Sequence, residues 1–208
     1  MALNNYANLK AAIKSWSKRE DVDDKLDDFI DICETEIYEN TVEPLRIRSM
    51  VTTTTGATSA SVRTQALPTG FLDPRRFDLT ISTQRTPIDY VTPSAQVIRT
   101  GTGIPSNYTI TDQIEYDTIP DAAYVTNIVH YAKLTALSAS NTTNDILTNH
   151  SNIYLYGSLA ILFQWAEDDE QAAKYKALFM AAINGANASD DEGSRGVASQ
   201  KRKRGRNP

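Results

Sequence analysis

The sequence predicts an α+β protein: a helical bundle formed by the N- and C-terminal helices, with an inserted β-rich region and a flexible basic C-terminal tail. Apolar residues recur at helical spacing near both ends of the chain, whereas short runs rich in Thr, Val and Ser fill its middle. No periodicity remains from about residue 188 onward. We therefore expect the bundle to comprise residues 1–48 and 136–187, the β-rich region residues 49–135, and the tail residues 188–208.

Charge is distributed unevenly along the chain. The 208 residues are 40% hydrophobic and 23% charged, which is typical of a globular protein. The formal net charge is −5, yet the six charged residues from Gly193 onward are all basic and carry +6. Residues 1–192 therefore carry −11. An acidic body with a basic tail indicates that the tail has an acidic partner.

No signal for secretion or membrane insertion is found. Cys33 is the only cysteine, so no intramolecular disulfide can form. The N-terminus, "MALNNYANLK", lacks the positive-then-apolar pattern of a signal peptide. The most apolar segment, "YLYGSLAILFQW", has about half of the ~20 residues that a membrane-spanning helix needs. We expect a soluble intracellular protein without membrane contact.

Two helices are predicted at the N-terminal end. The first, which Asn4 or Asn5 caps, has an apolar stripe formed by Leu9, Ala12, Ile13 and Trp16. The second lies in "DVDDKLDDFIDICETEIYENTVEP", where early aspartates suit the positive end of the helix dipole and Pro44 ends the helix. Its polar face carries Asp24, Asp27, Asp28, Asp31 and Glu34. That face is either a solvated surface or an anionic wall that repels a polyanion.

Extended structure is predicted from about Met50 to Leu134. The stretch "MVTTTTGATSASVRTQALP" has too few large apolar residues for a core face, which predicts an exposed β arm that is either solvated or paired with a neighbouring subunit. Short alternating runs follow, and "TITDQIEYD" predicts a hairpin that turns near Thr111 and Asp112. His130 falls in the last predicted strand, where we expect a core or interface role rather than a catalytic one.

Helix is predicted again after Ser138. The segment "NTTNDILTN" predicts a short helix, and a longer helical region follows from about Ile153. The longer region breaks at residues 167–170 and ends at Gly185. Gly157, within its first half, is expected to allow close helix packing.

Motifs for catalysis, metals or phosphates are not found in the sequence. The only two histidines, His130 and His150, are not arranged as a zinc-binding or nucleophile-activating pair. The segment "GTGIPSNYT" begins like a glycine-rich loop, but Pro105 and the lack of a following Gly and Lys exclude a phosphate cradle. We expect no enzymatic activity, no metal and no cofactor.

Four interpretations of the basic tail are open. It can bind nucleic acid through phosphate charge, act as a nuclear-import signal, dock into an acidic groove of a protein, or simply aid solubility. A body at −11 is repelled by DNA. The segregation of charge therefore favours a tail that anchors the acidic body on a protein partner.

The order of these motifs resembles the head-to-tail adaptor (connector) proteins of short-tailed bacteriophages. The resemblance runs from Tyr6 to Ala182 and includes "NYANLKAAIKSW", "LDDFIDICETEIYE", "LPTGFLDPRRFDL", "PIDYVTPSAQV" and "GIPSNYTITDQIEYDTIP". Matching positions are densest from His130 to Tyr175, and comprise Tyr131, Leu134, Leu137, Ser138, Asn144, Leu147, Tyr154, Leu155, Tyr156 and Gly157. Thr135 departs from the family pattern, which has Pro there.

The resemblance implies a structural protein of a podovirus virion, assembled in the host cytoplasm. Such adaptors form a twelve-subunit ring beneath the portal protein, extend the DNA ejection channel, and present a platform to tail nozzle and tail-fibre proteins. Genomic double-stranded DNA passes through without specific binding. A nucleic-acid-binding module that uses the basic tail is the alternative.

The resemblance also implies where contacts lie. The C-terminal extension of such adaptors reaches the portal, so we expect portal contacts from Arg195, Lys201, Arg202, Lys203, Arg204 and Arg206. Candidate residues for the lining of the channel are Asp27, Asp31 and Glu34.

Overall fold

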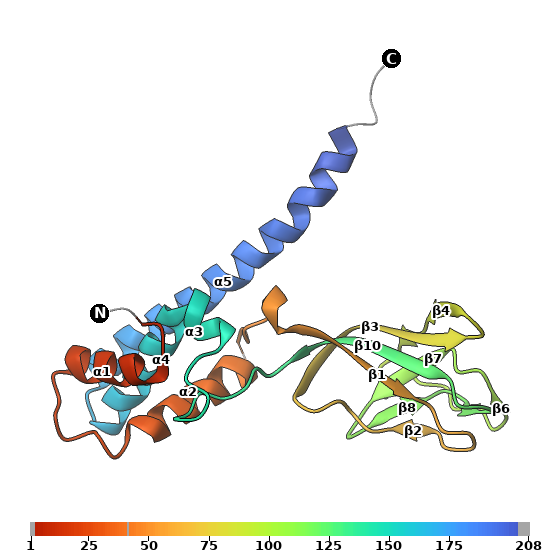
Figure 1. Ribbon diagram of the computed structural model, residues 1–208, viewed down its shortest axis with the longest axis horizontal. Coiled ribbons are helices and arrows are strands. Elements are labelled where there is room, and N and C mark those ends of the chain that lie inside the picture. Colours follow the sequence, from red (N-terminus) through yellow and green to blue (C-terminus); the bar gives the residue numbers. More distant parts are fainter. Residues whose placement is uncertain (1–2, 41, 204–208) are drawn as a thin grey trace. The chain divides into compact units, whose positions relative to one another are not determined.

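Helices occupy both ends of the chain and strands occupy its middle in the computed structural model (Figure 1). The structure describes residues 3–40 and 42–203, with side chains through residue 191. The chain divides into a helical unit, residues 1–49 with 134–208, and a β unit, residues 50–133. The predicted α+β class, with a β-rich insertion in a helical bundle, is confirmed.

One apolar helix forms the centre of the helical unit. The helices are α1 (Tyr6–Ser17), α2 (Leu26–Glu39), α3 (Asp145–Asn149), α4 (Ser151–Trp165) and α5 (Asp169–Lys203). Helix α4 contacts each of the other four and is buried around most of its circumference, as its nearly uniform apolar sequence requires. Helix α1 begins as expected, because the Asn5 side chain accepts a hydrogen bond of 2.8 Å from the Asn8 N–H.

Helices α2, α4 and α5 meet closely at Gly157. A Cβ atom at this position would lie 2.4 Å from Cys33 Sγ and 3.0 Å from the ring of Phe179. No side chain fits at 2.4 Å, so the glycine allows the close packing that the sequence predicted.

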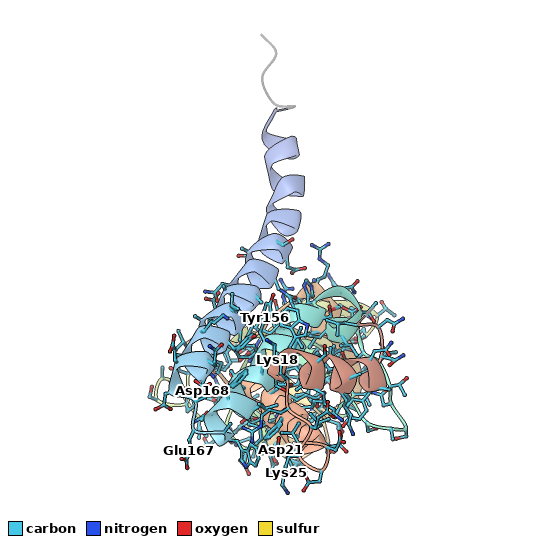
Figure 2. The ribbon with its side chains drawn as sticks, turned by 90° about the vertical axis from the view of Figure 1, so that its left-hand side faces the viewer. Lys18, Asp21, Lys25, Tyr156, Glu167 and Asp168 are labelled. Atoms are coloured by element: carbon cyan, nitrogen blue, oxygen red, sulfur yellow. The ribbon has the colours of Figure 1, made fainter. Side chains whose placement is uncertain are left out.

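The predicted break in the C-terminal helical region is confirmed. Glu167 has a φ of 57° and lies between α4 and α5, and Figure 2 shows it beside Asp168 at that turn. Asp168 Oδ1 accepts a hydrogen bond of 3.1 Å from the Gln171 N–H and so caps α5.

The predicted end of the last helix at Gly185 was wrong. Helix α5 continues to Lys203, because Ile183 and Ala186 remain buried on the same stripe and Asn187 bonds to another segment. The flexibility expected of residues 188–208 stays a prediction, since side chains from residue 192 and all of residues 204–208 lie outside the described part.

Two four-stranded sheets and one strand pair make up the β unit. The strands are β1 (Val51–Ala57), β2 (Thr64–Gln65), β3 (Phe71–Ile81), β4 (Gln84–Pro87), β5 (Asp89–Tyr90), β6 (Thr102–Gly103), β7 (Asn107–Ile110), β8 (Ile114–Tyr116), β9 (Ile119–Pro120) and β10 (Val125–Ala132). The sheet orders are β1-β10-β3-β4, β2-β8-β7-β5 and β6-β9. The short helical turn η1 (Arg48–Met50) precedes β1.

The core of the β unit comes from strands that alternate apolar and polar residues, together with Ile88 between β4 and β5. It contains Phe77, Leu79, Ile88, Tyr108, Ile114, Tyr116 and Ile128. The predicted hairpin is confirmed, since β7 and β8 pair antiparallel across residues 111–113. His130 is fully buried and stacks on Phe71 with ring centroids 5.2 Å apart, which confirms its core position.

The threonine-rich strand was predicted as an exposed arm, and it is exposed but also pairs with a strand of its own chain. Strand β1 pairs antiparallel with β10 over its whole length, and it forms an edge of the sheet. Thr52, Thr53 and Thr55 remain exposed. The pairing needs only backbone groups, which is why few large apolar residues are required there.

We predict that Gly157→Ala lowers the free energy of unfolding by about 1–3 kcal/mol, because the added methyl forces α2 and α4 apart. Urea unfolding measures this effect. Gly185→Ala is the matched control: nothing lies within 4 Å of a Cβ there, and α5 should gain up to about 1 kcal/mol. Equal stabilities for the two variants would contradict the close packing.

Candidate functional site

Buried polar groups bind residues 134–144, here called the connector, to the rest of the helical unit. Leu137 N–H donates to Glu34 Oε1 at 2.9 Å, and Tyr154 O–H donates to the same oxygen at 2.8 Å. Asn144 Nδ2 donates to Tyr154 Oη at 2.7 Å, while Leu134 N–H donates to Tyr38 Oη at 3.2 Å. One carboxylate thus links α2, α4 and the connector.

Glu34 is therefore not on the solvated face where the sequence analysis placed it. Its exposed fraction is 8%, because the connector covers this part of α2. Burial raises the pKa of Glu34, while the hydrogen bonds from Leu137 and Tyr154 oppose that change. Burial also raises the pKa of Tyr154, which therefore stays a hydrogen-bond donor.

The other two candidate channel residues line a groove between α1, α2 and the connector. The groove has a volume of about 640 Å³, and Asp27 and Asp31 lie on its wall with Lys10 and Leu137. Asp27 Oδ1 lies 2.6 Å from Lys10 Nζ and accepts a hydrogen bond of 2.7 Å from Tyr6 O–H. Lys10, followed by Tyr6, lowers the pKa of Asp27. Asp31 is exposed.

Helix α5 is bonded to the segment that follows α2. Asn187 Oδ1 accepts a hydrogen bond of 2.9 Å from Arg46 N–H, and Asn187 Nδ2 donates to the Pro44 carbonyl at 3.1 Å. A single side-chain amide therefore satisfies both a donor and an acceptor of this backbone segment. Asn187 was not predicted as a functional residue, because the sequence predicted the end of the helix at Gly185, two residues earlier.

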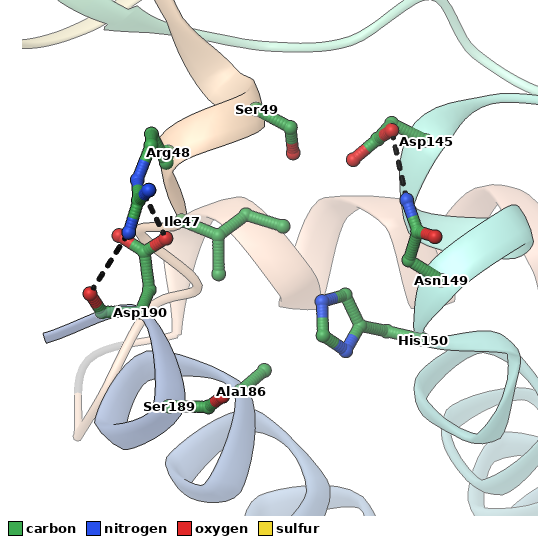
Figure 3. A pocket seen from close by; sticks show the side chains of 9 residues that line it. All are labelled: Ile47, Arg48, Ser49, Asp145, Asn149, His150, Ala186, Ser189 and Asp190. Atoms are coloured by element: carbon green, nitrogen blue, oxygen red, sulfur yellow. Dashed lines mark hydrogen bonds and ion pairs between the residues drawn. The ribbon is translucent and has the colours of Figure 1, made fainter. Parts of the chain in front are cut away.

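A polar pocket lies beside this attachment, at the last described side chains of α5 (Figure 3). Its volume is about 510 Å³, and its lining residues are Ile47, Arg48, Ser49, Asp145, Asn149, His150, Ala186, Ser189 and Asp190. Arg48 Nε lies 3.4 Å from Asp190 Oδ1, and Arg48 Nη2 donates to the Asp190 carbonyl at 3.4 Å. Asn187 and Asp190 together fix the helix just before its basic segment.

The basic residues predicted to contact a portal lie at and beyond the end of α5. The backbone of Arg195, Lys201, Arg202 and Lys203 is helical, and their side chains lie outside the described part. Arg204 and Arg206 lie outside it entirely. Helix α5 has 35 residues, so it extends about 50 Å at ~1.5 Å per residue.

The acidic charge of the body is concentrated in the helical unit. Residues 1–49 and 134–192 contain nine basic and 19 acidic residues, a net charge of −10. The β unit contains six basic and seven acidic residues, a net charge of −1. The basic segment is thus attached to the unit that carries nearly all of the negative charge.

Within the described residues, no group of three or more His, Cys, Asp or Glu side chains is arranged to hold a metal ion. His150 directly precedes α4 and makes no side-chain capping bond. No helix among the described residues combines the length and the apolar character needed to cross a bilayer.

Comparison with known proteins identifies the family to which this sequence is similar. The sequence model of the SU10 adaptor protein family matches residues 4–202, which include both units and nearly all of α5. The chain belongs to the SU10 adaptor protein family. A search of curated proteins finds no match. The expected relationship to phage head-to-tail adaptors is confirmed at the level of the family.

Membership in the SU10 adaptor family assigns a structural role. A phage adaptor is a component of the virion that contacts other capsid or tail proteins. The polar contacts of Glu34 and Asn187 fit such a role, because they hold backbone segments and helices in place.

We predict that two substitutions at Glu34 change the free energy of unfolding in different ways. Glu34→Ala leaves the Leu137 N–H and the Tyr154 O–H without their acceptor, and should cost about 1–3 kcal/mol for each buried group. Glu34→Gln retains an acceptor oxygen and cannot ionise. Urea unfolding of both variants from about pH 4 to about pH 8 measures these effects.

The pH dependence has a defined sign. Because the folded-state pKa of Glu34 lies above its usual 4.5, the stabilising contribution of this group is complete below pH 4.5 and is lost as pH rises through the raised pKa. Stability of Glu34→Gln relative to the natural protein should therefore increase with pH over that window. A constant difference would contradict the burial of an ionisable group here.

We predict that Asn187→Ala lowers the free energy of unfolding by about 1–2 kcal/mol, since it leaves Arg46 N–H and the Pro44 carbonyl unpaired. Ser189, which lies on the same helix and is exposed, supplies the control Ser189→Ala. Thermal unfolding checks both variants. An equal effect of the two would contradict an attachment through Asn187.

Proposed function

We propose that this protein is a head-to-tail adaptor that forms a ring between the portal and the tail nozzle. The resemblance to head-to-tail adaptors implies that the ring has twelve subunits. The ring extends the DNA channel and provides a platform for tail assembly in the host cytoplasm. The observation that carries this proposal is the family match over residues 4–202.

The proposal assigns portal binding to the C-terminal segment. Contacts of Asn187 and Asp190 hold the root of helix α5. From there the helix extends away from the other helices of its unit as far as Lys203 (Figure 1). The contacts that we propose are Arg195, Lys201, Arg202, Lys203, Arg204 and Arg206, and the complementary portal surface is acidic.

We propose that DNA passes along the acidic part of the protein, residues 1–192. A net charge of −11 over residues 1–192 disfavours binding of double-stranded DNA, so a genome can slide past without adhering. Asp31, and Asp27 with its partner Lys10, remain the proposed contributors to a channel surface. Glu34 contributes indirectly, since it fixes the connector beneath them.

We assign part of the contacts with neighbouring subunits and with tail proteins to the β unit. Strand β1 is an uncharged sheet edge with exposed threonines, and such an edge can be extended by a strand of a neighbouring subunit. Several large apolar side chains of this unit are also exposed, among them Val97 at 75% and Ile98 at 56%. Exposed apolar residues of this kind suit contacts with nozzle or fibre proteins.

We predict that the full chain adds a second tier of density to purified portal rings of its own phage. Negative-stain microscopy of the mixture detects this tier. A chain truncated after Asp191 lacks all six basic contacts and should give a weaker tier, because portal attachment loses its charged contacts.

Neutralising the basic residues in the full-length chain separates charge from helix length. Replacement of Lys201, Arg202, Lys203, Arg204 and Arg206 by Gln keeps the segment and should weaken the tier as the truncation does. If the tier is unchanged by both the truncation and the Gln replacements, the adaptor role would stand, but the basic C-terminal segment would be excluded as the anchor on the portal. No tier with the full chain would exclude portal docking, and salt-dependent DNA affinity of the same segment would then support the alternative function.

A further inference from the structure

The sheet β1-β10-β3-β4 of the β unit has two free edges, the strands β1 and β4. Strand β1 has seven residues and β4 has four, whereas the edge strands of the other sheets, β2, β5, β6 and β9, have two each. Pairing between strands needs several consecutive backbone groups. Within the β unit, all of which the structure describes, β1 and β4 are therefore the edges long enough to bind another strand.

The alternation of hydrogen bonds shows which backbone groups of β1 face the free side. The Thr58 N–H donates to the Tyr124 carbonyl at 2.9 Å, one position beyond the paired strands. In an antiparallel pair every second residue bonds to the partner strand, so residues 52, 54 and 56 bond to β10. The N–H and C=O groups of residues 51, 53, 55 and 57 therefore point away from β10.

The free edge of β1 lacks the features by which proteins block such edges. The strand contains no charged residue and no proline, and its register with β10 has no bulge. Thr53, Thr55 and Ala57 are exposed. Natural edge strands usually carry a charge, a proline or a bulge, because open backbone groups attract strands of other chains. An open edge of this length indicates a surface that is covered in the assembled protein.

Strand β4 presents a different edge. The Ile88 N–H donates to the Phe77 carbonyl at 3.0 Å, so by the same alternation Arg85 and Pro87 face away from β3. All four residues of the strand are exposed, and Pro87 has no N–H. Pairing of β4 with a second β4 would therefore lack a donor at Pro87 and would bring two arginines close together, which is unfavourable.

The β1 edge is complementary to the β4 edge. Strand β1 supplies N–H donors for the carbonyls of Arg85 and Pro87 and carbonyl acceptors for the N–H of Arg85, and its uncharged side chains do not repel Arg85. Neighbouring strands are antiparallel throughout this sheet, so β1 and β4 run in opposite directions. The β4 strand of a second copy that continues the sheet beyond β1 therefore pairs with β1 in the antiparallel sense.

We propose that β1 of one copy pairs antiparallel with β4 of the next copy, which joins their sheets edge to edge. A contact between two different edges leaves one of each free, so it can repeat around a ring, whereas pairing of β1 with β1 closes at two copies. The inference rests on the proposed ring and names a contact between its subunits.

Proline substitutions test whether the β1 edge is open. Thr53→Pro removes an N–H that faces the free side, and should leave the thermal unfolding midpoint of the dilute chain unchanged. Thr52→Pro removes an N–H that bonds to β10, and should lower that midpoint. Equal lowering by both variants would show that the N–H of residue 53 is already used within the chain, and would overturn the proposal.

Cysteine cross-linking identifies the partner strand. Cys33 is the only cysteine and is buried, so engineered thiols are the only accessible ones. Thr53→Cys with Arg85→Cys, and Thr55→Cys with Arg85→Cys, sample two neighbouring registers, since a disulfide requires Cα atoms about 4.4–6.8 Å apart. Mild oxidation of the full chain, alone and on portal rings, should convert one of these double variants into a ladder of dimers, trimers and larger products.

The three single-cysteine variants are the matched controls, and none should form cross-linked products. Dimers from Thr53→Cys or Thr55→Cys alone would assign pairing of β1 with β1 and overturn the proposal. A tier of density on the portal without a ladder would overturn the strand pairing and leave the adaptor role intact. A ladder without a tier would support the strand pairing and exclude portal docking, and the absence of both would overturn both.

Discussion

The buried carboxylate of Glu34 is the interaction on which the helical unit depends. It receives hydrogen bonds from the connector backbone and from Tyr154, and these partners are 103 and 120 residues away in sequence. Burial of a carboxylate is unfavourable unless such partners are present. The fold therefore places α2, α4 and the connector in one arrangement, because separating any of them would leave a charge or a donor without its partner.

The same principle recurs at the root of α5. Asn187 bonds to backbone groups at residues 44 and 46, and Arg48 bonds to the carbonyl and carboxylate of Asp190. These contacts join the last helix to the segment that follows α2.

Local signals in the sequence were sufficient for most elements. The helix cap was predicted at Asn4 or Asn5, a break at residues 167–170, and a close contact at Gly157. Each prediction depends on a few neighbouring residues or on an absent side chain. Glu34 and Asn187 could not be placed in this way. Their partners are more than 100 residues distant in sequence. From the local sequence alone, the polar residues of α2 therefore indicated a solvated face, and Gly185 indicated the end of a helix.

Native-state hydrogen exchange at the Leu137 amide tests the central claim most directly. The amide lies in a connector without helix or strand, and its donor bond to Glu34 is 2.9 Å long and buried. If Glu34 holds the connector, this amide should open only with global unfolding of the helical unit, within about 1 kcal/mol of the slowest amides of α4. Exchange at the rate of an exposed loop, with an opening free energy near ~0 kcal/mol, would contradict the account.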